Sequence, residues 1–204
     1  MNTIQKLKQK VGNKDEIWII GSSPTIDSLP DNFFDDKTTI ALNYTFQIFP
    51  NCSFIHAGHR EVYELIRDKY PKYLKKSIFY NTIFRNPVLD FTADSKESYY
   101  VNWDSYSIDE IRDRFVEAVD NGKIFRSYKS ILHTAIQIAF YLGASKIILV
   151  GCEGKKIKDR YHTRLLPRYY NNEQPIYLDK VNKGTKWLKE ILKEYGTEIR
   201  YYSN

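Results

Sequence analysis

The sequence has few cysteines and no long apolar run. Its two cysteines, Cys52 and Cys152, are too few to favour a disulfide-dependent secreted fold and fit a reducing compartment better. Apolar runs such as those at 17–20 and 147–152 are much shorter than the ~20 residues that cross a bilayer. No apolar stretch of the kind found in secretory signals follows the cationic segment at 1–15. We therefore expect a cytoplasmic protein without a transmembrane segment.

Several motifs of well-known enzyme classes are also missing. The sequence contains no G-x-x-x-x-G-K-[ST], which excludes a P-loop kinase, and no G-x-S-x-G, which counts against an α/β-hydrolase. It contains no D-x-D, the carboxylate pair with which many sugar-nucleotide enzymes hold a divalent metal. His56 and His59 lie near Glu61, but no Cys pair or further His completes a set of metal ligands. We therefore expect no metal and no other cofactor.

The length and composition favour one globular domain. The chain has 204 residues, of which 42% are apolar and 27% are charged, so it can bury a core and does not have the composition of a disordered protein. The formal net charge is +6, which is basic but mixed. We predict a single domain over 1–204.

Hydrophobic periodicity predicts strands that alternate with helices. Strands are predicted at 16–21, 38–43, 51–57, 77–84 and 145–151, and helices at 60–70, 107–119 and 130–143, followed by a final helix and an edge strand within 185–202. A short helix is also predicted directly after the first strand. This alternation predicts an α/β fold, with a mostly parallel, Rossmann-like sheet and helices on both faces.

The segment 130–151 is the clearest unit of this pattern. Residues 130–143 are apolar nearly all round, which predicts a buried helix, and Gly143 ends it as a C′ glycine. The strand at 145–151 shows no alternation of apolar and polar residues, as expected for a central parallel strand that is covered on both faces.

In an open parallel sheet, ligands bind beyond the carboxyl ends of the strands. In the loop GSSPTI after the first strand, Gly21 allows a tight turn, and the hydroxyls of Ser22, Ser23 and Thr25, together with backbone N–H groups, favour an anion. The alternative is an ordinary capped turn between strand and helix. Asn43 follows the second strand, where its amide either contacts a base or ribose or caps the next turn.

A basic loop at about 151–177 follows the last core strand. Between 151 and 170, six cationic residues occur against two acidic ones, so this stretch carries four of the six net positive charges. Cations and Tyr hydroxyls suit a phosphate or pyrophosphate, which they bind through charge-assisted hydrogen bonds; a solvated basic loop is the alternative. The candidate phosphate-binding residues are Lys155, Lys156, Arg160 and Arg164, with Arg168 as a further possibility.

Histidines supply the candidate general base. His162 lies in the polar, cationic loop, where an imidazole can stay neutral near pH 7 and accept a proton. His133 lies inside the predicted buried helix and is expected to be a core residue. His56, at the end of the third strand, is a possible ligand contact.

Three motifs together resemble a family of bacterial glycosyltransferases. IIGSSPTI at the first strand, ALN about twenty residues later, and SILHTAIQIAFYLGASKIILVGCE are similar to patterns of the lipooligosaccharide-type sialyltransferases and of the related domain of motility-associated, flagellin-glycosylation proteins. The resemblance covers roughly two thirds of the chain and is weakest across 57–125. The long third pattern is specific, whereas the first-strand motif alone is not.

The resemblance implies a metal-independent, inverting glycosyltransferase with a single nucleotide-sugar-binding domain of the sialyltransferase-like fold, a variant of the GT-A type. The donor would be a nucleotide sugar, with CMP-sugars favoured, and the acceptor a glycan or another hydroxyl compound. The basic loop would act as a lid over the diphosphate.

The resemblance also implies roles for individual residues. The first-strand loop and Asn43 hold the nucleotide, Ser130 at the start of the buried helix helps to bind the donor, Tyr161 grips the phosphate, and His162 removes the proton from the acceptor hydroxyl. The chain departs from the family in two places. Glu153 stands where an Asp is usual, and no His precedes the final helix, where the sialyltransferases carry their base.

Other functions stay open on the sequence. The same domain type occurs in a pterin pyrophosphokinase, so diphosphate transfer is the nearest enzymatic alternative. The basic loop also admits glycosylation of a nucleic-acid base, or a non-catalytic module that binds nucleotides or nucleic acid. Because the cations are clustered in one loop and not spread along a face, a small anionic donor is favoured over nucleic acid. The sequence indicates no oligomeric state.

Overall fold

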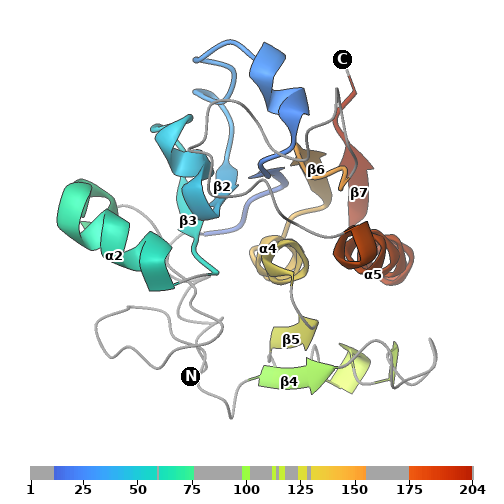
Figure 1. Ribbon diagram of the computed structural model, residues 1–204. Helices are drawn as coiled ribbons and strands as arrows, with labels where there is room; N and C mark the ends of the chain where they lie inside the picture. The colour runs from blue at the N-terminus through green and yellow to red at the C-terminus, as the bar shows by residue number, and fades with distance from the viewer. Residues whose placement is uncertain are drawn as a thin grey trace.

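The computed structural model describes residues 12–58, 60–75, 98–101, 112–113, 115–117, 124–127, 130–154 and 175–203. Their centre is a five-stranded sheet in the order β3-β2-β1-β6-β7 (Figure 1). Every neighbouring pair in this sheet is parallel, which confirms the prediction of an α/β fold with a parallel sheet. The strands are β1 (Glu16–Ile20), β2 (Thr39–Leu42), β3 (Phe54–His56), β6 (Lys146–Val150) and β7 (Glu198–Tyr201).

Helical segments cover both faces of the sheet. The α-helices α4 and α5 pack on one face, where they bury Ile19, Ile40 and Ile147. The helix α2 and the 3₁₀ helices η1 and η2 pack on the other face, against Ala41 and Ile20. These elements, with one further 3₁₀ helix, are α2 (Arg60–Lys69), α4 (Ile131–Tyr141), α5 (Pro175–Glu194), η1 (Pro24–Ser28), η2 (Asn43–Gln47) and η3 (Pro71–Lys75).

The two central strands are those with uninterrupted apolar sequence. In β6 the four residues after Lys146 are all buried, and in β1 Ile17, Ile19 and Ile20 are 0% exposed. A strand between two covered faces has no solvent side for polar residues, which explains the missing alternation. The prediction that the strand at 145–151 is an interior parallel strand, covered on both faces, is therefore confirmed.

The helix α4 is buried along most of its length, as predicted. Eight successive residues, 132–139, are buried, and the helix ends before Gly143, which has a left-handed φ of +87°. The Gly143 N–H donates to the Phe140 carbonyl oxygen at 2.9 Å, which closes the last turn. A glycine adopts this backbone conformation without the steric cost that a side chain would add.

Two features extend or correct the predicted order of elements. The helix α5 begins at Pro175, ten residues before the predicted helix start at 185, so the basic loop is shorter at its end than predicted. Proline is compatible with this position because the first N–H groups of a helix have no partner within it. A small second sheet pairs β4 (Ser98–Val101) in parallel with β5 (Ile124–Ser127), next to α4; it was not predicted.

Two predicted elements are only partly described or not described. Residues 112–113 and 115–117, within the helix predicted at 107–119, are helical. The strand predicted at 77–84 lies outside the described residues. Among the helices that the structure describes, none combines the length and apolar character needed to span a bilayer.

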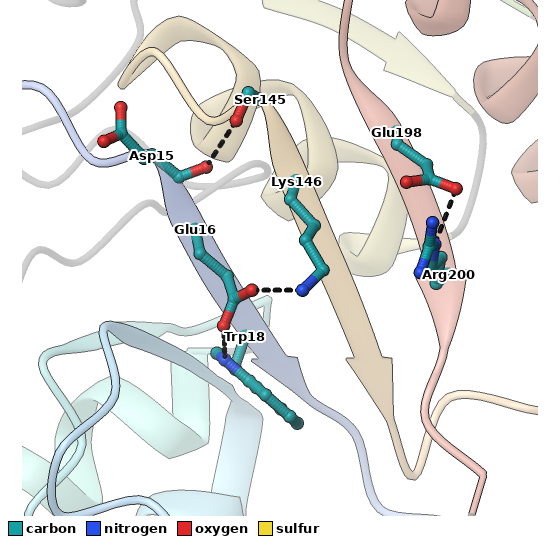
Figure 2. A network of polar contacts seen from close by, with 7 residues as sticks. All are labelled: Asp15, Glu16, Trp18, Ser145, Lys146, Glu198 and Arg200. Carbon is teal, nitrogen blue, oxygen red and sulfur yellow. Dashed lines mark hydrogen bonds and ion pairs between the residues drawn. The ribbon is translucent and has the colours of Figure 1, made fainter.

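Side chains tie β1 to β6 at the amino edge of the sheet (Figure 2). The Lys146 Nζ lies 2.5 Å from one carboxylate oxygen of Glu16, and the Trp18 Nε1–H donates to the other at 2.7 Å. The hydrogen bond from Lys146 is the main cause that lowers the pKa of Glu16. The Ser145 Oγ donates to the Asp15 carbonyl oxygen at 3.2 Å. The polar groups named here, at the amino ends of β1 and β6, therefore bind one another.

Candidate functional site

The order of the strands reverses between β1 and β6. The chain continues from β1 to β2 and β3 on one side, whereas β6 and β7 lie on the other side. The connections that leave β1 and β6 at their carboxyl ends therefore diverge, and this is where parallel sheets offer a crevice for ligands. The segments here are 21–25 and 151–154, which belong to the first-strand loop and the basic loop of the prediction.

Two glycines bring the backbones of these segments into direct contact. The Gly21 N–H donates to the Val150 carbonyl oxygen at 2.7 Å, and the Ser23 N–H donates to the Gly151 carbonyl oxygen at 2.8 Å. A Cβ atom on Gly21 would lie 2.2 Å from the Gly151 oxygen, and Gly151 itself has a φ of +66°. The close approach of the two strand ends, and not a left-handed turn at Gly21, is thus what requires a glycine at position 21.

A side-chain contact joins the two segments. The Thr25 Oγ1 lies 3.0 Å from both carboxylate oxygens of Glu153, to which it donates its single hydrogen. Both residues are half-buried. Since the Thr25 hydrogen is directed at a carboxylate, Thr25 does not offer it to a phosphate in this arrangement. The predicted anion loop and Glu153 therefore meet in one place.

Ser23 supplies a buried hydroxyl beside this contact. Its side chain belongs to a residue that is 5% exposed, and its Oγ has no hydrogen-bond partner among the described residues. Ser23 precedes η1 as its N-cap, but the hydroxyl makes no capping bond. A buried hydroxyl without a partner costs about 1–3 kcal/mol, so this group is a candidate ligand contact. Ser22 is half-buried.

Asn43 makes a hydrogen bond that joins the segment after β2 to the segment after β3. Its backbone has a φ of +50°, and its side-chain Oδ1 accepts a hydrogen bond from the Gly58 N–H at 2.8 Å. Asparagine tolerates this left-handed conformation better than most residues. The Asn43 side chain thus makes a backbone contact with the segment after β3, and no side-chain capping bond is made at η2, the turn that begins at Asn43. This contact leaves the Nδ2 group as the part of the amide that a ligand would meet.

The start of α4 lies at the same place. A Cβ on Gly58 would lie 2.1 Å from the Ile131 Cγ2, so the first turn of α4 packs closely on the end of β3. Ser130 is the N-cap, in an extended conformation, and its hydroxyl makes no capping hydrogen bond. The structure thus brings Asn43 and Ile131, the residue directly after Ser130, to the same glycine from different elements.

His56 and His133 are both buried. His56 is 1% exposed at the end of β3. His133 is 1% exposed, and its Nε2 lies 3.0 Å from the Val181 carbonyl oxygen and 3.2 Å from the Thr185 Oγ1. Burial lowers the pKa of His133 to about 4, because the charged imidazolium would lose its hydration. The prediction that His133 is a core residue with hydrogen-bond partners is confirmed.

The first half of α5 adds residues that sequence reasoning missed. The Asn182 Nδ2 lies 3.5 Å from the Gly154 carbonyl oxygen, beside the Glu153 segment. Thr185 contacts His133 and also hydrogen-bonds to Tyr201; the pKa of that tyrosine is raised to about 12, mainly by burial. The sequence signal for these residues was a set of polar side chains directly before the apolar stripe of the final helix. It was missed because the helix was predicted to begin only at position 185.

The cysteine thiols are not activated nucleophiles. Burial raises the pKa of Cys52 to about 12 and that of Cys152 further, so both thiols stay protonated near neutral pH. Among the residues that the structure describes, no three His, Cys, Asp or Glu side chains gather as a metal site would require.

The rest of the predicted site lies outside the described residues. It comprises the predicted base, the neighbouring tyrosine and the cations of the basic loop: His162, Tyr161, Lys155, Lys156, Arg160, Arg164 and Arg168. Their roles stay predictions from the sequence.

Comparisons of the chain with protein-family models, with curated proteins and with solved structures found no match. The function is therefore argued from the residues and from the geometry of the sheet's carboxyl edge.

Proposed function

We propose that the protein is a metal-independent, inverting glycosyltransferase that uses a nucleotide sugar, with a CMP-sugar favoured and a glycan or other hydroxyl compound as acceptor. The observation that carries the proposal is the contact between Thr25 and Glu153, which spans the point where the strand order reverses. Next to it lies the hydroxyl of Ser23, which has no hydrogen-bond partner among the residues that the structure describes. Rossmann-like sheets bind nucleotides at this position, and the motifs shared with the sialyltransferase-like family support the same assignment.

The charges suggest how the nucleotide lies. The Glu153 carboxylate accepts hydrogen bonds and repels phosphate, so it suits the hydroxyl groups of a ribose. The phosphate then lies away from Glu153, towards the hydroxyl of Ser23. The first turn of α4, after Ser130, presents backbone N–H groups and a partial positive charge to an anionic part of the donor.

The reaction follows from this placement and from the basic loop. The oxygen of the acceptor hydroxyl attacks the anomeric carbon of the sugar, on the face opposite to the nucleotide. The bond between that carbon and the phosphate oxygen breaks, the nucleotide leaves with the electron pair, and the hydroxyl proton moves to His162. Tyr161 and the cations of the basic loop stabilise the departing phosphate by charge-assisted hydrogen bonds.

A thermal-shift panel tests the binding half of the proposal. CMP, CDP, UDP and a CMP-sugar are added in EDTA, and at least one of them should stabilise the protein; a ligand at a hundred times its Kd adds about 2.7 kcal/mol. Asn43→Ala should reduce this shift because it removes the Nδ2 donor. Ser145→Ala is the matched control, since it removes a polar side chain from the opposite edge of the sheet.

The same panel separates the alternatives. Stabilisation by ATP that requires Mg²⁺ would favour diphosphate transfer. Binding of an oligonucleotide with a steep dependence on salt would favour a nucleic-acid function, because each neutralised phosphate releases a counterion. Release of CMP from a CMP-sugar in EDTA, in the presence of an acceptor, supports glycosyl transfer directly. If no nucleotide stabilises the protein, the proposal is wrong.

A further inference from the structure

The strand β7 is an edge of the sheet, paired with β6. The Glu198 N–H donates to the Ser145 carbonyl oxygen and the Tyr202 N–H donates to the Leu149 carbonyl oxygen, both at 2.9 Å. Peptide groups alternate in direction along a strand, so the N–H and C=O groups of Ile199 and Tyr201 face away from β6. No labelled helix or strand lies beyond β7 on that side in Figure 1. In the described part of the chain, β7 therefore presents an open edge that can accept another strand.

We propose that this edge pairs with β7 of a second copy of the chain, antiparallel, about a two-fold axis through Ile199. In an antiparallel pair, residues whose peptide groups face outward must lie opposite each other, so a two-fold axis has to pass through a residue and not between residues. With the axis at Ile199, the two Ile199 residues exchange both backbone hydrogen bonds. Glu198 of each copy then lies opposite Arg200 of the other.

The charges select this register. An axis through Glu198 would place two carboxylates face to face, and an axis through Arg200 would do the same for two guanidinium groups. The axis at Ile199 instead forms two equivalent ion pairs, in the type of cross-strand pair whose side chains are closest. Both side chains are exposed, Glu198 to 50% and Arg200 to 59%, and lie on one face of the strand, where they are 2.6 Å apart (Figure 2). The edge is thus complementary to itself.

One of the exposed aromatic side chains belongs to this edge strand. Among the described residues, the large apolar side chains that stay exposed are Tyr195 at 40% and Tyr201 at 39%. Tyr201 belongs to β7 and Tyr195 lies three residues before it. In the register proposed, Tyr201 lies opposite Thr197 of the second copy. Pairing would therefore bury apolar surface as well as satisfy backbone groups.

Two charge-reversal variants test the proposal by sedimentation velocity over a concentration series at low salt. Glu198→Arg gives two cations on the strand and Arg200→Glu gives two anions, so each variant opposes its own copy. We expect a concentration-dependent dimer for the unmodified protein and a dimer Kd at least ~10-fold weaker for each variant alone. An equimolar mixture of the two variants should regain the dimer, because both cross-strand pairs then join opposite charges.

The mixture separates the proposed interface from a role within one chain. Both variants lose the ion pair between Glu198 and Arg200 along the strand, so only pairing between copies can make the mixture differ from its components. Glu190→Arg, at an exposed position of α5, is the control for a change of charge alone and should leave the dimer intact. A monomeric unmodified protein, or a dimer that neither variant weakens, would overturn the proposal.

A double variant covers the case in which a single variant does not fold. Glu198→Arg with Arg200→Glu exchanges the two charges and keeps one of each on the strand. It should dimerise with itself but not with the unmodified protein, since the mixed pair opposes like charges at both positions. Fluorescence energy transfer between differently labelled copies measures this sorting, and free mixing of the two proteins would contradict the register.

Discussion

Replacement of Ser23 by alanine should strengthen the fold and weaken nucleotide binding. Most polar-to-alanine changes in a core remove a hydrogen bond, but the Ser23 Oγ has no partner among the described residues although Ser23 is 5% exposed. The change therefore removes a desolvated hydroxyl and breaks no bond within the described chain. Since such a group costs about 1–3 kcal/mol, the free energy of unfolding of Ser23→Ala should rise by about 1 kcal/mol. For a chain of this size the melting temperature then rises by about 2–4 °C.

The effect on the ligand has the opposite sign. A hydrogen bond to a charged phosphate oxygen contributes about 1.5–3 kcal/mol, so its loss should raise the Kd of CMP by about 10-fold or more. Chemical denaturation gives the stability and calorimetric titration gives the Kd. Ser145→Ala, in which the lost hydroxyl donates to the Asp15 carbonyl oxygen, is the matched control and should lower stability slightly without changing the Kd.

Two results would refute the reasoning about Ser23. A loss of more than 1 kcal/mol of stability in Ser23→Ala would mean that the hydroxyl has a partner in the folded chain. A gain of stability with an unchanged Kd would mean that the hydroxyl is buried but does not contact the nucleotide. The two measurements are independent, so each part of the argument can fail separately.

Three further variants test other parts of the site and the core. Thr25→Val should raise the Kd of CMP by up to ~10-fold because Glu153 loses the hydrogen bond that orients it, and Thr25→Ser should restore the affinity. His162→Ala should lower kcat by at least ~10²-fold with the donor Kd nearly unchanged, and the acidic limb of the pH profile of kcat should disappear; turnover near that of the unmodified protein would remove the base role. Because the pKa of His133 falls from 6.5 to about 4 on folding, the unfolded chain takes up a proton first as the pH drops, and the free energy of unfolding should decrease by about 3 kcal/mol between pH 6.5 and 4. Denaturation at several pH values should show a much flatter decline in His133→Leu.

The core of the sheet could be predicted from the sequence because the pattern of apolar and polar residues along a strand indicates which of its faces are buried. An apolar run without alternation requires cover on both faces, and this was enough to predict that β6 is an interior strand of the sheet. The start of α5 was missed for the same reason. Its first turns, PIYLDKVNKG, contain Pro175 and Gly184 and have little apolar periodicity, so the local pattern is typical of a loop. Packing of Gly184 against His133 stabilises a helix there that local propensity does not.

The contacts within the site could be predicted only in part. The loops after the strands were identified because ligands bind at the carboxyl edge of a parallel sheet. The bond between Thr25 and Glu153 joins positions 128 residues apart and depends on the register of β1 and β6, which composition does not reveal. Asn43 also shows what the sequence could not decide. Its position after the second strand allowed either a ligand contact or a cap of the next turn. In the structure its Oδ1 accepts a hydrogen bond from the N–H of Gly58, in the segment after β3, and such a contact between distant segments cannot be read from local sequence.

The contact between Gly184 and His133 determines the distance between α4 and α5, although neither residue has a place in the proposed chemistry. A Cβ on Gly184 would lie 2.3 Å from the His133 Cε1, so α4 and α5 are as close there as their backbones and the imidazole allow. Asn182, two residues before Gly184, lies against the Gly154 carbonyl oxygen beside Glu153. The spacing of two helices under the sheet thus determines how far α5 stands from the β6 loop. If the proposed donor binds here, selection for a bulkier donor would be expected to enrich replacements around position 184, in the helix interface, before it changes residues of the loops after β1 and β6.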